Sequence, residues 1–298
     1  MEWKLFQNSC MEINSQLSKL WGDFKDKAEL NCILQRNFIF SEVQPCDILI
    51  LGINPSDDKT NIPSSFKFSN SKGVYFNKFH KIANAIDPTS KYIFDYLDVF
   101  CFRETHQSNI SIFLKNSVGV SFLCEHLTIT QNIIEELKPK LIIVFNKLAG
   151  NFLGVNAKKV GSDYTNIWLG YEFFEPENYN CKIIAGFKNS NERINKNITA
   201  SSLIGTPVYF SKYLGRSKNI EIETIIEEIK HVINNHLYFD DRFTGRNAFI
   251  QSVNKLNNAN TEKLNAIEEG RYEESARLRD KERDLLKSLE NGTYLPTL

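Results

Sequence analysis

Two short, wholly apolar runs constrain the fold of this chain more than any other feature. Residues 48–51 read Ile-Leu-Ile-Leu, and residues 141–145 read Leu-Ile-Ile-Val-Phe. A strand that is apolar on both faces is typical of a parallel sheet, because crossover helices cover both sides of the sheet. The sequence therefore predicts an α/β fold, as a three-layer α/β/α sandwich with a mainly parallel sheet.

Helical and strand patterns alternate along the rest of the chain. We expect further strands over 92–102, 181–185 and 198–200, and helices over 12–36, 76–86, 127–137, 148–153 and 220–237. The polar stretch between the first strand and residue 73 is expected to be a long loop. After residue 240 the chain becomes charge-dense, and Gly270 divides it into two short helices that should form an antiparallel hairpin.

These patterns predict an α/β domain over 1–240, a linker over 241–254 and an α-helical hairpin over 255–290. A hairpin of that size is too small to hold a core alone, so it should dock on another surface. The formal net charge is zero, with 36 basic and 36 acidic residues. Overall charge therefore neither requires nor excludes a nucleic-acid partner.

The cysteine content and the start of the chain indicate the setting. No signal peptide is visible and no apolar run is long enough to span a bilayer, so we expect no membrane partner. The six cysteines are scattered without a Cys-x-x-Cys pair. That scatter favours reduced thiols in a cytoplasmic protein over a metal site. We expect no metal and no cofactor.

The first apolar run leads directly into the loop Gly52-Ile53-Asn54-Pro55-Ser56. Ligands of open parallel sheets bind beyond the carboxyl ends of the strands. Pro55 pushes Asn54 into an extended conformation, where its neutral amide can orient a water or bind the edge of a base. Gly52 would let the backbone approach a ligand, and Ser56 with nearby amides could hold a phosphate. The alternative is a plain turn, since Asn-Pro is ordinary turn chemistry.

This loop resembles the first motif of the uracil-DNA glycosylase superfamily, in the Gly-x-Asn-Pro form of its mismatch-specific and single-strand-selective branches. Other parts resemble the superfamily in the expected order: the aromatic helix beginning Phe76-Asn-Lys-Phe79, the proline-led strand 139–145, and the segment 200–207 in the place of the second motif. The likeness covers roughly residues 40 to 235. The second motif departs from the family pattern, because it has no histidine and Ser201-Ser202 replaces Pro-Ser.

The resemblance implies a hydrolase that removes uracil or a related damaged base flipped out of DNA. It assigns catalysis to Asn54 and Ser202, with Asn54 positioning a water. It assigns substrate binding to a larger set: Gly52, Ile53, Pro55, Ser56, Ser201, Phe68 and Phe76. Phe68 and Phe76 are both candidates to stack on the base; Phe68 lies nearer Asn54 in sequence, and a core role is favoured for Phe76. A polar group within 98–105 should read the base edge.

A basic strip surrounds the segment that takes the place of the second motif. Residues 181–218 carry seven lysines and arginines, among them Lys212 and Arg216, and one acid, Glu192. Interleaved aromatic residues make this strip suitable for a phosphate backbone and exposed bases, so DNA is the expected partner. Leu203 and Ile204 could be a wedge that fills the gap left by an extruded base. The alternatives are a solvated loop and two core anchors.

The segment from Leu264 to Leu285 resembles the UVR motif, which joins bacterial nucleotide-excision-repair subunits and occurs in some protease–chaperone proteins. The resemblance implies a bacterial origin and either a protein partner or self-association. Tyr272, Ala276 and Leu278 are expected to seat the two helices. The alternative is a generic charged helical pair.

Three classes of function therefore remain at the level of sequence. The first is a DNA repair glycosylase. The second is a non-catalytic DNA- or nucleotide-binding member of the fold that recruits a partner, favoured by the missing histidine. The third is a protease adaptor or stress regulator, which rests on the hairpin alone.

Overall fold

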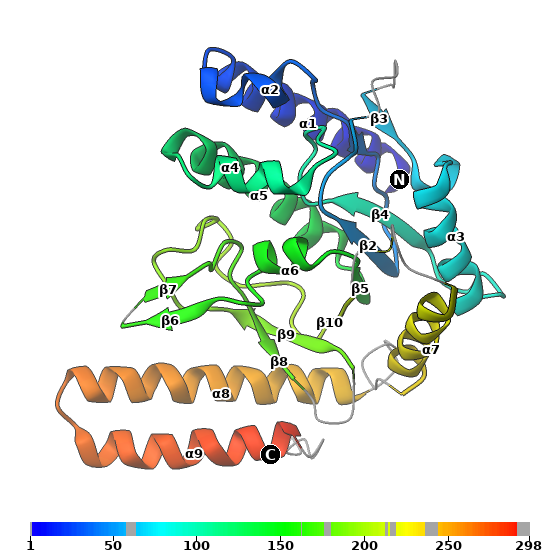
Figure 1. Cartoon of the computed structure of the whole chain (residues 1–298). Helices are drawn as coiled ribbons and strands as arrows, with labels where there is room; N and C mark the ends of the chain where they lie inside the picture. Colours follow the sequence, from blue (N-terminus) through cyan, green and yellow to red (C-terminus); the bar gives the residue numbers. More distant parts are fainter. Residues whose placement is uncertain are drawn as a thin grey trace.

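The computed structural model describes residues 2–57, 64–161, 163–175, 180–211, 214, 219–235 and 244–290 (Figure 1). Its helices are α1 (Glu2–Phe24), α2 (Asn31–Leu34), α3 (Val74–Ile86), α4 (Ile110–Phe113), α5 (Ser117–Leu137), α6 (Lys147–Leu153), α7 (Asn219–Asn235), α8 (Thr244–Glu268) and α9 (Tyr272–Glu290). Its strands are β1 (Phe40–Ser41), β2 (Ile48–Gly52), β3 (Ser65–Phe66), β4 (Phe94–Asp98), β5 (Leu141–Val144), β6 (Lys158–Val160), β7 (Asp163–Thr165), β8 (Tyr171–Phe174), β9 (Lys182–Phe187) and β10 (Pro207–Phe210). None of the helices described there combines the length and apolar character needed to cross a bilayer.

A six-stranded sheet in the order β4-β2-β5-β10-β9-β8 forms the centre of the molecule. The strands β4, β2, β5 and β10 are parallel, and β9 and β8 continue the sheet antiparallel. The prediction of a mixed α/β fold with a mainly parallel sheet is therefore confirmed. The two apolar runs that predicted it are β2 and β5, which are direct neighbours in the sheet.

The side chains of β2 alternate between two core clusters. Leu49 and Leu51 pack with apolar residues of α1 and α5, whereas Ile48 and Ile50 pack with apolar residues of α3 and α7. All four side chains are fully buried. Burial of one such side chain stabilises the fold by about 1.5–3 kcal/mol, which explains why this strand has no polar face.

The observed elements differ from the predicted ones in several places, and the short strands β1, β3, β6, β7 and β8 were not predicted. The strand expected over 198–200 is instead β10, which begins at Pro207; a proline is tolerated at the first residue of a strand. Residues 198–200 lie in a loop. The helix expected over 12–36 is interrupted after Phe24, and the short α2 follows. The helix expected over 127–137 is longer, because α5 begins at Ser117 behind an Asn116 side-chain cap and ends before Pro139.

The C-terminal helices α8 and α9 pack side by side and antiparallel (Figure 1). Gly270, with φ 73°, makes the turn between them, as expected. The helix α8 is longer than predicted, because it begins at Thr244, inside the segment expected as a linker, whereas α9 ends at Glu290 as predicted. Near its start, Val253 and Leu256 pack on Ile183 and Ala185 of β9, so the hairpin docks on the sheet.

The two helices of the hairpin do not pack against each other through all the side chains that the sequence suggested. Tyr272 is 73% exposed and Ala276 is also exposed, while Leu278 is half-buried. The buried contacts are made by Ala266 and Leu285, together with an ion pair between Lys263 and Glu282. The expectation was wrong for Tyr272 because that residue starts α9 at the tip of the hairpin, where no opposing helix covers it.

Candidate functional site

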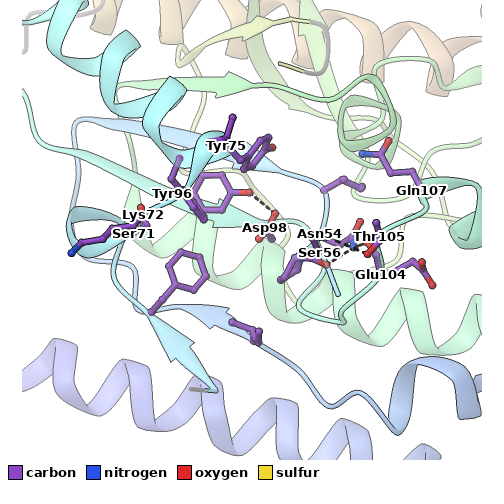
Figure 2. Close-up of a pocket in the computed structure, with 17 residues that line it drawn as sticks. Asn54, Ser56, Ser71, Lys72, Tyr75, Tyr96, Asp98, Glu104, Thr105 and Gln107 are labelled. Atoms are coloured by element: carbon purple, nitrogen blue, oxygen red, sulfur yellow. Dashed lines mark hydrogen bonds between the residues drawn. The ribbon is translucent and has the colours of Figure 1, made fainter. Parts of the chain in front are cut away.

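A pocket of about 530 Å³ opens at the carboxyl ends of β2 and β4 (Figure 2). Three segments supply most of its wall: the loop 53–56 after β2, residues 71–76 at the start of α3, and polar residues from the end of β4 onward. Those polar residues are Tyr96, Asp98, Glu104, Thr105 and Gln107. The position agrees with the rule that parallel sheets bind ligands beyond their strand ends.

Hydrogen bonds hold the loop after β2 against the loop after β4. Three backbone amides of the second loop donate to carbonyl oxygens of the first: Val99 to Gly52 at 3.1 Å, Phe100 to Ile53 at 2.8 Å and Glu104 to Pro55 at 2.9 Å. The hydroxyls of Ser56 and Thr105 lie 3.2 Å apart. The loop Gly52-Ile53-Asn54-Pro55-Ser56 is therefore a fixed part of the pocket wall and not a free turn.

Asn54 is oriented by two of these backbone groups. Its Nδ2 donates to the carbonyl oxygen of Glu104 at 2.6 Å and to that of Pro55 at 2.9 Å. Both partners are acceptors, so the amide must present its nitrogen to them. In the part of the chain that the structure describes, the Oδ1 of Asn54 has no protein partner. That oxygen can accept a hydrogen bond from a water or a ligand in the pocket.

Charged groups fix the Glu104 end of this arrangement. Arg36 pairs with Glu104 at 2.9 Å and with Asp57 at 3.3 Å, and Arg103 pairs with Asp57 at 3.4 Å. Burial opposes ionisation of Glu104, but hydrogen bonds from the His106 amide, the Asn109 side chain and Arg36 outweigh it and lower the pKa. Glu104 is thus a fixed carboxylate that anchors the loop.

Asp98 and Tyr96 form a buried pair in the pocket, beside the loop after β2 (Figure 2). The hydroxyl of Tyr96 donates to Asp98 Oδ1 at 2.6 Å. Burial raises the pKa of Asp98 to about 7, although the Tyr96 hydrogen bond lowers it. A Cβ on Gly52 would lie 2.0 Å from the Tyr96 hydroxyl and 2.3 Å from Asp98 Oδ1. The glycine is therefore needed to leave room for this pair, and the close approach of a ligand at Gly52 stays a prediction.

The aromatic residues have the reverse of their expected roles. Phe68 is 5% exposed and stacks on His80 at 4.5 Å, so it belongs to the core. Phe76 lines the pocket together with Phe66 and Tyr75. Phe68 is nearer to Asn54 in sequence, but the turn η2 (Phe68–Asn70) directs its ring inward.

Ser201 and Ser202 do not reach this pocket. Ser201 Oγ donates to Glu135 Oε1 at 2.7 Å, and the amide of Ser202 donates to Glu135 Oε2 at 2.6 Å. Their loop precedes β10, whereas Asn54 follows β2, and both strands are parallel to β5. The serines therefore lie at the amino ends of the parallel strands and Asn54 at their carboxyl ends. The expected pairing of Asn54 with Ser202 was wrong.

The two residues expected as a wedge are packed within the protein. Leu203 is fully buried, and Ile204 packs on the hairpin beside Val253. Three basic residues of the strip contact other parts of the protein: Lys182 pairs with Glu175, Lys188 donates to the Tyr171 carbonyl oxygen at 2.7 Å, and Arg193 donates to that of Ile198 at 2.7 Å. Lys212 and Arg216 lie outside the described residues.

Sequence reasoning missed Tyr96 and Tyr75 and named no single residue within 98–105. The available signal was the spacing Tyr96-x-Asp98 at the end of a strand next to β2, because residues two apart lie on the same face. The pairing of β4 with β2 could not be read from the chain, and it alone brings Asp98 beside Gly52.

An Asp98→Asn substitution is expected to make folding stability less dependent on pH. The pKa of Asp98 in the folded chain, about 7, lies above its ordinary 3.8, so the folded state binds the proton more tightly. The unfolding free energy therefore falls as pH rises from about 4 to 7. Between pH 5 and 7 the wild type should lose about 2 kcal/mol more than the variant, as measured by urea denaturation. Asp95, whose pKa burial raises to about 6, contributes equally to both proteins. Equal losses in both would contradict the assignment.

The pocket combines an amide acceptor, a buried carboxyl group and aromatic faces, which suits a planar heterocycle with a polar edge. In the described ranges no three histidine, cysteine, aspartate or glutamate side chains come together as a metal site would require. No protein-family model matches the sequence, and no curated protein matches it at a significant level.

Proposed function

We propose that the protein is a DNA glycosylase of the uracil-DNA glycosylase type, which hydrolyses the N-glycosidic bond of uracil or a related damaged base flipped out of DNA. The observation that carries this proposal is Asn54. It lies in a Gly-x-Asn-Pro loop at the end of β2, with its Nδ2 bound to the chain and its Oδ1 available on the wall of a pocket. The proposal includes a cytoplasmic, bacterial setting and needs no cofactor.

The finer part of the fold proposal is a three-layer α/β/α sandwich of the same type. Two features support it. The side chains of β2 belong to two separate core clusters, one shared with α1 and α5 and the other shared with α3 and α7. The four parallel strands also run in the order β4-β2-β5-β10, with the first-motif loop on a central strand. Such an arrangement creates a ligand site where neighbouring strand ends meet.

The reaction requires a water to replace the base at C1′ of the sugar. The C1′–N bond breaks ahead of the attack by water, which gives an oxocarbenium-like sugar, and the base departs with the bonding electron pair. Asn54 Oδ1 accepts a hydrogen bond from the attacking water and so directs its oxygen at C1′. The proton that the water loses when the C1′–O bond forms passes to the anionic base after it has departed. Because burial raises the pKa of Asp98 to about 7, its carboxyl group keeps a proton in a large share of the molecules near neutral pH, and that protonated form donates a hydrogen bond to the departing base and compensates its negative charge. Phe76 supplies a ring face for the base.

One departure favours a second candidate function. None of the described pocket residues is a histidine, and Ser202 is bound to Glu135 elsewhere. A non-catalytic DNA- or nucleotide-binding protein would need only the pocket. Binding to uracil-containing DNA without turnover would select that function. Absence of any DNA binding would leave the third, a protease adaptor or stress regulator acting through the hairpin.

Release of uracil from a labelled oligonucleotide tests the proposal directly. The substrate is presented as a U·G pair, a U·A pair and a single strand, because extrusion costs least where pairing is weak or absent. We expect release fastest from the single strand or the U·G pair. Release that does not exceed an Asn54→Ala control on any of the three would refute catalysis.

The hairpin is proposed to bind a protein partner or a second copy of the chain, as a UVR-type module. Its tip exposes two large side chains, Ile267 at 45% and Tyr272 at 73%. Arg271, between them in sequence, pairs with Glu269 and Glu274 and so orders the turn. An ordered tip with an apolar and an aromatic side chain has the composition of a protein contact.

The double substitution Ile267→Asp with Tyr272→Asp is expected to abolish partner binding. Both side chains are exposed, so the fold should tolerate the change. We expect a loss of recovered partner of about tenfold or more in a pull-down with the full-length protein, because buried aromatic anchors dominate such contacts. Sedimentation of the protein alone reports self-association. The control is Ile93→Asp, at an exposed position beside β4. Recovery equal to wild type would remove the tip from the interface.

A further inference from the structure

Proteins that distort or open duplex DNA frequently insert an apolar side chain between the bases, and such a side chain can occupy the place of an extruded base. Leu203 is fully buried and Ile204 packs on α8, so neither can enter a duplex. If the function proposed above uses such a side chain, it is another residue at the mouth of the pocket. That residue should be apolar, exposed and held on a rigid element.

Val74 meets these conditions. It lines the pocket and is 80% exposed, the highest exposed fraction among the large apolar side chains that the structure describes. It is the first residue of α3, which is anchored by the buried side chains of Phe79 and Ile82. Because Val74 lies at the edge of the pocket and its side chain is exposed, that side chain is free to contact a nucleic acid whose base occupies the pocket.

The chain around Val74 is suited to a phosphate backbone. Residues 64–86 contain four lysines and no acidic residue, in a protein of zero net charge. Lys72 is exposed and lines the same pocket, and Lys81 is exposed on α3. Lys78 is held to the Leu214 carbonyl oxygen at 2.7 Å and so contributes its charge from a fixed position. Positive charge beside an apolar tip is the composition expected where a duplex is contacted and a base is extruded.

We propose that Val74 enters the base stack of duplex DNA in place of the base that occupies the pocket, with Lys72 on the adjoining phosphate backbone. The proposal rests on the proposed glycosylase function and adds the residue that fills the gap. Because an unpaired single strand needs no wedge, Val74 acts on duplex substrates and has less effect on single strands.

Two readouts test it in the full-length protein. The first is the fluorescence of 2-aminopurine placed next to the uracil of a U·G duplex, which rises when the neighbouring base is unstacked. The second is the ratio of uracil release rates from duplex and single strand. Val74→Ala should suppress most of the fluorescence rise and lower the rate ratio about tenfold. Val74→Ile should retain both. The matched control Val160→Ala, at an exposed valine of β6, should change neither.

The outcomes separate this proposal from the proposed function. A wild-type fluorescence rise with Val74→Ala, or an equal loss of rate on both substrates, overturns the role of Val74. So does release from the single strand with no fluorescence rise on the duplex, which leaves the glycosylase function intact. No release from any substrate overturns the glycosylase function; a fluorescence rise that still requires Val74 then supports the insertion alone.

Discussion

Replacing Glu135 with alanine is expected to lower the free energy of unfolding by about 3–5 kcal/mol, because it leaves several buried donors without an acceptor. The carboxyl group accepts hydrogen bonds from the hydroxyls of Tyr171 and Ser201, at 2.9 Å and 2.7 Å, and from the Ser202 amide at 2.6 Å. Ser202 Oγ lies 2.8 Å from the same group. Glu135 therefore joins the end of α5 to β8 and to the loop before β10.

Urea denaturation of three proteins measures this effect. Glu136→Ala changes the next residue of α5, which is exposed, and should alter stability by less than about 0.5 kcal/mol. Glu135→Gln keeps one acceptor but directs an amide nitrogen at a donor, so its loss should be intermediate. A Glu135→Ala variant as stable as the Glu136→Ala control would show that the buried network contributes nothing.

This network also explains why the second motif was misplaced from the sequence. A Ser-rich segment after a basic stretch has the composition of a ligand-binding loop, and Ser201 and Ser202 do bind a carboxylate. The carboxylate belongs to the protein itself, on a helix more than sixty residues earlier in the chain. Composition cannot distinguish a loop that binds a ligand from a loop that binds a buried carboxylate of the protein, because both need the same hydrogen-bond donors.

The central strands were predictable for a different reason. An apolar run such as 48–51 must be covered on both faces whatever its neighbours are, so its local pattern determines its place. The position of the first-motif loop could be predicted from this strand, because the loop follows its carboxyl end and ligands of parallel sheets bind beyond those ends. For Asp98 the sequence predicted only a polar group somewhere within 98–105. The proximity of Asp98 to Gly52 depends on the pairing of β4 with β2, which the local sequence does not indicate. Pairing between strands forty residues apart leaves no mark in the local sequence.

The first-motif asparagine has a further consequence: Asn54→Asp is expected to slow base release and not to accelerate it. An aspartate in open solution is the stronger base, so a site that only lacked basicity would gain from the change. Here the Nδ2 of Asn54 donates to the carbonyl oxygens of Glu104 at 2.6 Å and Pro55 at 2.9 Å. A carboxylate would set a negative oxygen against two acceptors and displace the loop.

Single-turnover release from the U·G duplex should fall about 10²–10³-fold for both Asn54→Ala and Asn54→Asp, because a positioned water-binding group contributes that much to catalysis. Only the second variant should recover activity as pH falls, since protonation of the introduced carboxyl restores a donor toward Glu104. The control is Asn260→Asp, the same change at an exposed position of α8, away from the pocket. An Asn54→Asp variant faster than wild type would show that the loop tolerates a charge there and that Asn54 acts by basicity rather than by orientation.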